Sequence, residues 1–200
     1  MTDAGPAAVS RRKPRGGVLR RLIGDRSGSS SIEFAILAIP FLVAVVASLE
    51  TFVAFAGEQL LATATETMAR KVRTGEITAA MSKEDFRKAF CAEISIMMTC
   101  SATEAKNASK LFVDVRSFSD FSKIPAAIPR IGGASGDLDT SGFKFAPGGP
   151  TTITIVRAYY RWEVITDLVR PFITNLRPAG TSMPKDYLMV ATAAFRTESY

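Results

Sequence analysis

Glutamates, serines and cysteines are the residues of this chain whose type and spacing could do chemistry. The chain contains no histidine, which removes the commonest general base. Three Ser-x-x-Lys matches lie scattered in loops and tail, as chance would place them: Ser10/Lys13, Ser141/Lys144 and Ser182/Lys185. A Gly-x-Ser-x-Gly elbow and a phosphate-binding P-loop are absent from the sequence. We therefore expect a protein that is not an enzyme and takes no cofactor.

Glu33 is the most unusual of these residues, because it borders an apolar run. The run Phe34–Leu49 contains no charged residue, and with Ile32 and 51–55 it exceeds the roughly 20 residues that span a bilayer as a helix. A carboxylate inside such a helix is costly unless it finds a partner. Glu33 either pairs with a specific group or extends to the nearby headgroups. Glu50, at the other end, either contacts a partner helix or marks the membrane interface.

Charge is distributed unevenly and predicts the orientation of this helix. Seven of the 25 basic and two of the 19 acidic side chains lie in residues 1–27. The rest of the chain therefore carries 18 basic and 17 acidic side chains. A basic flank stays on the cytoplasmic side, so residues after Ala56 should lie outside the cytoplasm. A nearly neutral remainder lacks the charge that binds nucleic acid, and we expect no nucleic-acid partner. The basic flank instead fits contact with membrane lipid.

Cys91 and Cys100 are the only cysteines. Outside the cytoplasm an even count predicts a disulfide, which for so short a loop contributes about 2–3 kcal/mol. A zinc site needs more ligands, and redox motifs separate their cysteines by two residues. The stretch Asp137–Gly142 resembles half of a calcium loop, but Gly148 stands where a glutamate is needed, so we expect an acidic turn and no metal.

Two helices should position these groups. Apolar residues at helical spacing continue the first helix to about Arg73, with Gly75 as its stop; they are Leu61, Ala64, Met68 and Val72. Pro40 should kink or loosen this helix. Ser82 followed by Asp85 has the spacing of an N-cap, which predicts a second helix over 83–98 with its aromatic residues in the core.

Three strands are predicted by runs of β-branched and aromatic residues, at Leu111–Phe118, Thr151–Trp162 and Tyr187–Thr197. The predicted fold class is α+β: a long N-terminal transmembrane helix extends into a small domain with a second helix and a three-stranded antiparallel sheet. Residues 119–150 should form a long loop. The segment Glu163–Leu176 should contain one or two helical turns broken at Pro171, and it is either an exposed apolar patch or part of the core.

The motif from Gly28 through Ser29 to Glu33 and Phe34, followed by an apolar helix, resembles the cleavage site of type IV prepilin-like proteins. The rest of the chain resembles TadE-like pseudopilins (minor pilins) of the tight-adherence (Tad/Flp) type IV pilus system. The features that support this are the helix into Arg70–Gly75, the cysteine pair and the ending Val190–Tyr200; Thr197-Glu198-Ser199 stands where Asn-Glu-Pro is expected.

The resemblance implies cleavage after Gly28 by a prepilin peptidase, with Ser29 as the new N-terminus. Glu33 and Phe34 become the fifth and sixth mature residues, and Glu33 can then pair with the new amine and set the register of assembly. It also implies three regions: a basic cytoplasmic leader (1–28), a transmembrane helix (29–56) and a periplasmic domain (57–200). The location is then the bacterial inner membrane or the pilus. The partners are the peptidase, other pilins or pseudopilins, and inner-membrane pilus assembly proteins that serve adhesion.

Two other interpretations remain open. Ala54-Phe55-Ala56 resembles a signal-peptidase site, and cleavage after Ala56 would release a secreted binding domain. The helix could also be an uncleaved anchor for a periplasmic scaffold unrelated to pili. The N-terminal residue of the mature protein distinguishes all three.

Overall fold

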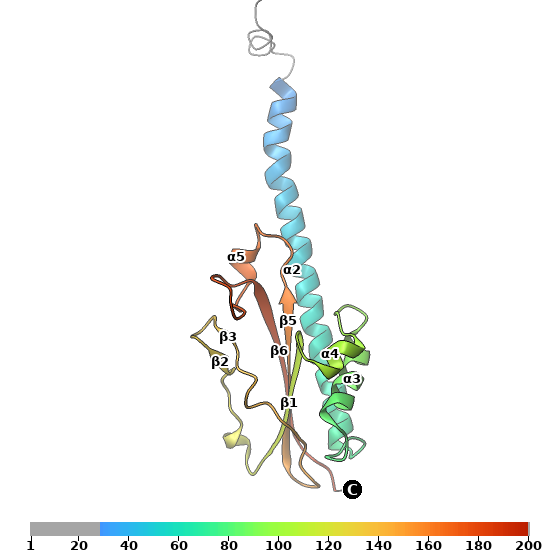
Figure 1. Cartoon of the computed structure of the whole chain (residues 1–200). Coiled ribbons are helices and arrows are strands. Elements are labelled where there is room, and N and C mark those ends of the chain that lie inside the picture. Colours follow the sequence, from blue (N-terminus) through green and yellow to red (C-terminus); the bar gives the residue numbers. More distant parts are fainter. Residues whose placement is uncertain (1–28, 200) are drawn as a thin grey trace, which may run out of the picture. The chain divides into compact units, whose positions relative to one another are not determined.

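The computed structural model describes residues 29–199 of the chain (Figure 1). By contacts the chain divides into two units, Met1–Val45 and Val46–Tyr200. The described part of the first unit is helical, whereas the second contains the end of the same helix, shorter helices and a sheet. The predicted α+β class is confirmed.

The long helix α2 spans Ser29–Arg73. Pro40 lies within it without ending it. The last turn carries basic side chains, which stabilise the helix by interacting with the negative end of its dipole; they are Arg70, Lys71 and Arg73. Gly75 then adopts a φ of 78°, which costs glycine little, so the predicted end of this helix is confirmed.

The second helix, α3, spans Lys83–Ile94, and Ser82 caps it by accepting a hydrogen bond from the Asp85 backbone N–H. The predicted end at Met98 is wrong, because the helix gives way at Ser95 to turns that lead into the disulfide-bonded loop. A short helix, α4, follows at Ala102–Lys106 and was not predicted. The aromatic residues of α3, Phe86 and Phe90, are fully buried, as predicted.

The main sheet has four strands in the order β4-β1-β5-β6. The three long strands, β1 (Leu111–Phe118), β5 (Ile153–Glu163) and β6 (Asp186–Arg196), pair antiparallel as predicted. The prediction of three strands is nevertheless wrong, because β4 (Phe145–Ala146) pairs with β1 in parallel.

Side chains explain why so short a strand joins the sheet. The buried Asp114 of β1 accepts a hydrogen bond from the Lys144 backbone N–H at 3.0 Å. Phe145 contacts Phe86 of α3, with ring centroids 4.9 Å apart. Two residues give too short a pattern for sequence periodicity to detect, so the signal for β4 lies in these long-range contacts.

The segment 119–150 is mostly irregular, with a 3-10 turn, η2 (Phe121–Lys123), and a two-stranded ribbon of β2 (Arg130–Ile131) and β3 (Asp137–Leu138). Its acidic turn is held by protein donors. Asp137 forms an ion pair with Arg161 at 2.6 Å, and Asp139 accepts hydrogen bonds from the backbone and hydroxyl of Ser141.

The core of the second unit lies between the sheet and the helices. The predicted apolar stripe of α2 is buried here: Leu61, Ala64, Met68 and Val72. Gly57 permits close packing, since a Cβ at this position would lie 3.3 Å from Trp162 and 3.4 Å from Met98. A smaller cluster contains Leu138, Tyr159, Leu176 and Leu188.

Candidate functional site

The sequence places the candidate site at the start of α2. Gly28, the residue before the expected cleavage point, lies outside the described residues. Ser29 is the first residue of α2, and Glu33 lies four residues on in the same helix. Residues four apart are neighbours on one helix face, so a group at the Ser29 nitrogen and the Glu33 carboxylate are about one turn apart. The helix thus brings these two positions together.

The surface around Glu33 is apolar and exposed. Ile32 and Phe34 are 64% and 73% exposed, and the exposed set continues along the helix with Ile36, Leu37, Ile39, Phe41 and Leu42. Exposed apolar side chains on all sides are typical of a helix in lipid. Among the described residues, one helix is long and apolar enough to cross a membrane, and it lies near the N-terminus.

Glu50 forms contacts that sequence reasoning missed. Its Oε1 accepts hydrogen bonds from the backbone N–H groups of Ile165, at 2.7 Å, and Thr166, at 3.3 Å. Its Oε2 is buried and has no hydrogen-bond partner among residues 29–199. Glu50 therefore joins α2 to the segment that follows β5, within one unit. No local pattern could reveal this contact, because the partner lies 115 residues away.

The segment contacted by Glu50 combines buried and exposed apolar residues. Val164 and Val169 are buried, whereas Ile165, Leu168 and Phe172 are exposed. The short helix α5 spans Arg170–Ile173 with Pro171 in its first turn. The predicted helical turn is therefore confirmed, but the expectation that Pro171 breaks it is wrong, because proline fits the first turn, where its missing N–H is not needed.

An open apolar groove lies between this segment and α2. Its volume is about 300 Å³, and it is lined by Thr51, Ala54, Phe55, Glu58, Phe172, Ile173 and Tyr187. The Tyr187 hydroxyl and Glu58 Oε2 lie 3.4 Å apart at its border. Burial raises the pKa of Tyr187, and the nearby Glu58 carboxylate raises it further. The groove can receive an apolar group, and its polar atoms are few.

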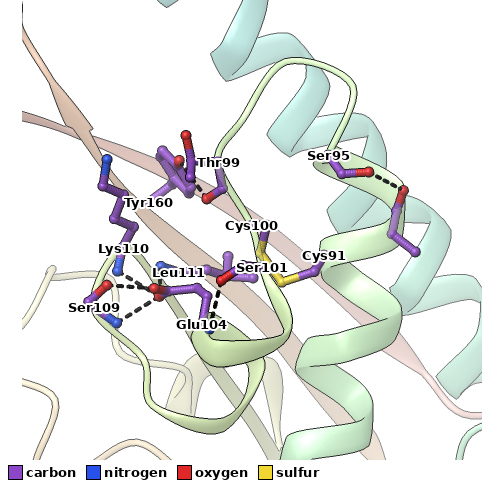
Figure 2. Close-up of a disulfide and its surroundings, with 11 residues drawn as sticks. Cys91, Ser95, Thr99, Cys100, Ser101, Glu104, Ser109, Lys110, Leu111 and Tyr160 are labelled. Atoms are coloured by element: carbon purple, nitrogen blue, oxygen red, sulfur yellow. Dashed lines mark hydrogen bonds between the residues drawn. A yellow bond between two sulfur atoms is a disulfide. The ribbon is translucent and has the colours of Figure 1, made fainter.

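The predicted disulfide joins Cys91 of α3 to Cys100, just before α4 (Figure 2). Beside it, the buried Glu104 of α4 accepts four hydrogen bonds: from the Ser109 hydroxyl at 2.5 Å, and from the backbone N–H groups of Ser109 at 2.7 Å, Lys110 at 2.6 Å and Leu111 at 2.8 Å. This carboxylate fixes the start of β1.

Burial disfavours the ionised form of Glu104, but the hydrogen bonds outweigh it and lower the pKa of this carboxyl. The pattern Ser101-x-x-Glu104 predicts the start of a short helix, since Ser101 accepts a bond from the Glu104 N–H. The Glu104 carboxylate, however, accepts hydrogen bonds from the residues at the start of β1 and not from the backbone N–H of Ser101. The function of Glu104 could not be found from that pattern.

The described residues contain no group of three or more His, Cys, Asp or Glu side chains placed to hold a metal ion. The serines of the two described Ser-x-x-Lys matches, Ser141 and Ser182, are exposed. Ser141 is held by the turn at Asp139.

Comparison of the chain with protein-family models, curated proteins and solved structures gives no match.

Proposed function

We propose that this protein is a pseudopilin, or minor pilin, of a tight-adherence type IV pilus system. A prepilin peptidase removes the leader after Gly28, and the mature chain helps to assemble an adhesive pilus. It does so by helix packing, without catalysis and without a cofactor. The observation that supports this most directly is the position of Glu33, one helical turn from Ser29 in an exposed apolar helix.

The physical reason concerns the amine that cleavage creates. A free ammonium at Ser29 would stand at the start of a helix in lipid, where a lone charge is costly. The Glu33 carboxylate, of the same chain or of a neighbouring subunit, can pair with it, because a buried ion pair is tolerated where a single charge is not. When the pair joins neighbouring subunits it acts as a register device, since only one axial position of the two helices brings the charges together.

The basic leader supports one orientation. It remains in the cytoplasm, where the peptidase site then lies, and the domain 57–200 faces the periplasm. The disulfide fits an oxidising compartment. The location we propose is the bacterial inner membrane, crossed once, with later entry into the pilus.

Release of a secreted domain by cleavage after Ala56 has less support. The bond between Ala56 and Gly57 lies inside the continuous helix α2. Gly57 is buried against Trp162 and Met98, so a peptidase would have to unwind a packed helix to reach the bond. An uncleaved periplasmic scaffold remains the alternative that the experiment must separate.

The test is the N-terminal residue of the full chain, co-expressed with a prepilin peptidase and purified from membranes. We expect Ser29 at the N-terminus, loss of cleavage in Gly28→Ala, and normal cleavage in the matched leader variant Gly24→Ala. Glu33→Ala should still insert in the membrane but enter pili poorly. An intact N-terminus in the presence of active peptidase would refute the proposal, as would a chain that begins at Gly57.

A further inference from the structure

The segment 164–173, called here the apolar segment, exposes three large side chains. Ile165 is 84% exposed, Leu168 58% and Phe172 86%. In the same segment Val164 and Val169 are buried and attach it to the domain. Single exposed apolar residues are ordinary, but a cluster on one short segment marks a surface that meets an apolar partner.

The position of this segment along α2 indicates which partner. A hydrocarbon core of about 30 Å takes roughly 20 helical residues, so a span that begins near Phe34 ends near Val53. Glu50 lies within the last turn of that span, and its carboxylate accepts hydrogen bonds from the backbone N–H groups of Ile165 and Thr166. The apolar segment is therefore held at the level where α2 leaves the hydrocarbon.

The surface is also continuous with the apolar helix. On α2, Leu49 and Phe52 are exposed on either side of Glu50, and Phe55 lines the groove that Phe172 borders. The groove lies entirely within the unit Val46–Tyr200. An apolar medium that surrounds Leu49 and Phe52 would meet the apolar segment without interruption.

The charged groups around the apolar segment are paired inside the domain. Arg170 forms an ion pair with Asp167 at 2.6 Å and donates to the Val164 carbonyl at 3.2 Å. Glu163 lies within ion-pair distance of Lys110 and Lys185. The exposed surface thus presents apolar groups with balanced charge at its border, which fits an acyl boundary better than a charged protein surface.

We propose that the apolar segment is a second membrane contact of this protein, in addition to α2. Ile165, Leu168 and Phe172 insert at the boundary between acyl chains and headgroups of the leaflet next to the domain. Glu50 holds the segment at that depth through its two backbone hydrogen bonds. The domain is thereby held at the bilayer surface by two contacts, α2 and the apolar segment. The inference goes beyond pilus assembly and does not depend on cleavage after Gly28.

The test places a tryptophan at Phe172 in the full chain and measures quenching by lipids with a spin label. Phe172→Trp is reconstituted in phosphatidylcholine vesicles that contain phosphatidylcholine labelled at a shallow or a deep acyl position. The parent protein supplies the signal of Trp162, its single tryptophan. Because Phe172 is largely exposed, the larger ring should not disturb the core. Leu168→Trp provides a second position in the same segment.

A matched control comes from the other end of the sheet. Phe121 is 53% exposed and lies shortly after β1. The last residue of β1, Phe118, pairs with Ile153, the first residue of β5, whereas the apolar segment follows the last residue of β5, Glu163. The length of β5 puts this end roughly 33 Å away along the strand. Phe121→Trp introduces the same exposed ring far from the proposed contact.

We expect the shallow label to quench Phe172→Trp and Leu168→Trp at least about twofold more than the parent, with emission shifted to shorter wavelength. Phe121→Trp should match the parent. Adding Glu50→Ala to Phe172→Trp should reduce the quenching, whereas adding Glu66→Ala, at an exposed carboxylate of α2 outside the groove, should not. Equal quenching of Phe172→Trp, Phe121→Trp and parent in folded protein would overturn the lipid contact and leave a protein partner as the occupant. Unchanged quenching with Glu50→Ala would overturn the holding role of Glu50. Neither result depends on whether Ser29 is the mature N-terminus.

Discussion

Glu104 offers a direct test of how the domain is held together. Glu104 is only 8% exposed, and its carboxylate accepts four hydrogen bonds at the start of β1. Two substitutions separate its charge from its bonds. Glu104→Gln keeps an oxygen for the three backbone N–H groups and an amide that can donate to the Ser109 hydroxyl. Glu104→Ala removes every acceptor.

The magnitudes follow from the surroundings of the donors. Leu111 is buried, so its N–H would lose its partner without gaining water, whereas Ser109 is exposed and can be resolvated. An unsatisfied buried donor costs about 1–3 kcal/mol, and bonds to a charged acceptor exceed neutral ones by about twofold. We therefore expect Glu104→Ala to lower the free energy of unfolding by about 2–4 kcal/mol, and Glu104→Gln by about 1–2 kcal/mol.

The charge also predicts a dependence on pH. The pKa of Glu104 is lowered from its ordinary value of 4.5, so the unfolded chain takes up this proton before the folded chain does. The stabilisation is complete above pH 4.5 and is lost as the pH falls through the folded-state pKa. The difference between wild type and Glu104→Gln should therefore shrink below pH 4.5 and stay constant above it.

The assay is urea unfolding of the full chain in a neutral detergent, followed by the fluorescence of Trp162. Trp162 packs near Gly57 of α2 and so reports on separation of the sheet from the helix. Glu66→Gln, an exposed carboxylate of α2, is the control and should change stability by less than about 0.5 kcal/mol. A difference for Glu104→Gln that is the same at low and neutral pH would refute the role of its charge.

Two further predictions concern neighbouring groups of the same domain. Replacing both Cys91 and Cys100 by serine should lower the free energy of unfolding by about 2–3 kcal/mol, and a reducing agent should have the same effect on the wild type but none on the variant. Burial and the nearby Glu163 raise the pKa of Asp186, which means that the folded chain disfavours its ionised form. The contribution of Asp186 to the free energy of unfolding therefore falls as the pH rises through its folded-state pKa. At pH 7, Asp186→Asn should therefore leave the free energy of unfolding unchanged or raise it by no more than about 1 kcal/mol, as measured by urea unfolding. A clear loss of stability in this variant would contradict the prediction.

Long periodic patterns predicted most of the fold. The stripe of α2 and the three long strands could be recognised because each repeats one spacing over many residues. The N-cap at Ser82 and the stop at Gly75 are local chemistry, and both were visible in the sequence. The parts that were wrong or missed, β4 and α4, are only two and five residues long, and β4 is held by contacts with distant elements.

The apolar segment shows a different limit. Its spacing left burial and exposure equally open, and the structure gives both answers within a few residues. Val164 and Val169 are buried, while Ile165 and Phe172 are exposed. Which residue of such a segment faces inward depends on where β5 ends and on the hydrogen bonds from Glu50, and neither is a property of local sequence.

Glu33 and Glu50 look alike in sequence, since each is a single carboxylate at one end of an apolar run. The structure separates them. Glu50 has its donors inside the unit Val46–Tyr200, so removing it should disturb that unit before any partner binds. Glu33 lies among exposed apolar side chains of the other unit, so its removal should leave the domain stable and act on assembly. On the proposed function, a carboxylate inside a membrane helix is costly, and pairing with the Ser29 amine of a neighbouring helix gives a reason to keep Glu33.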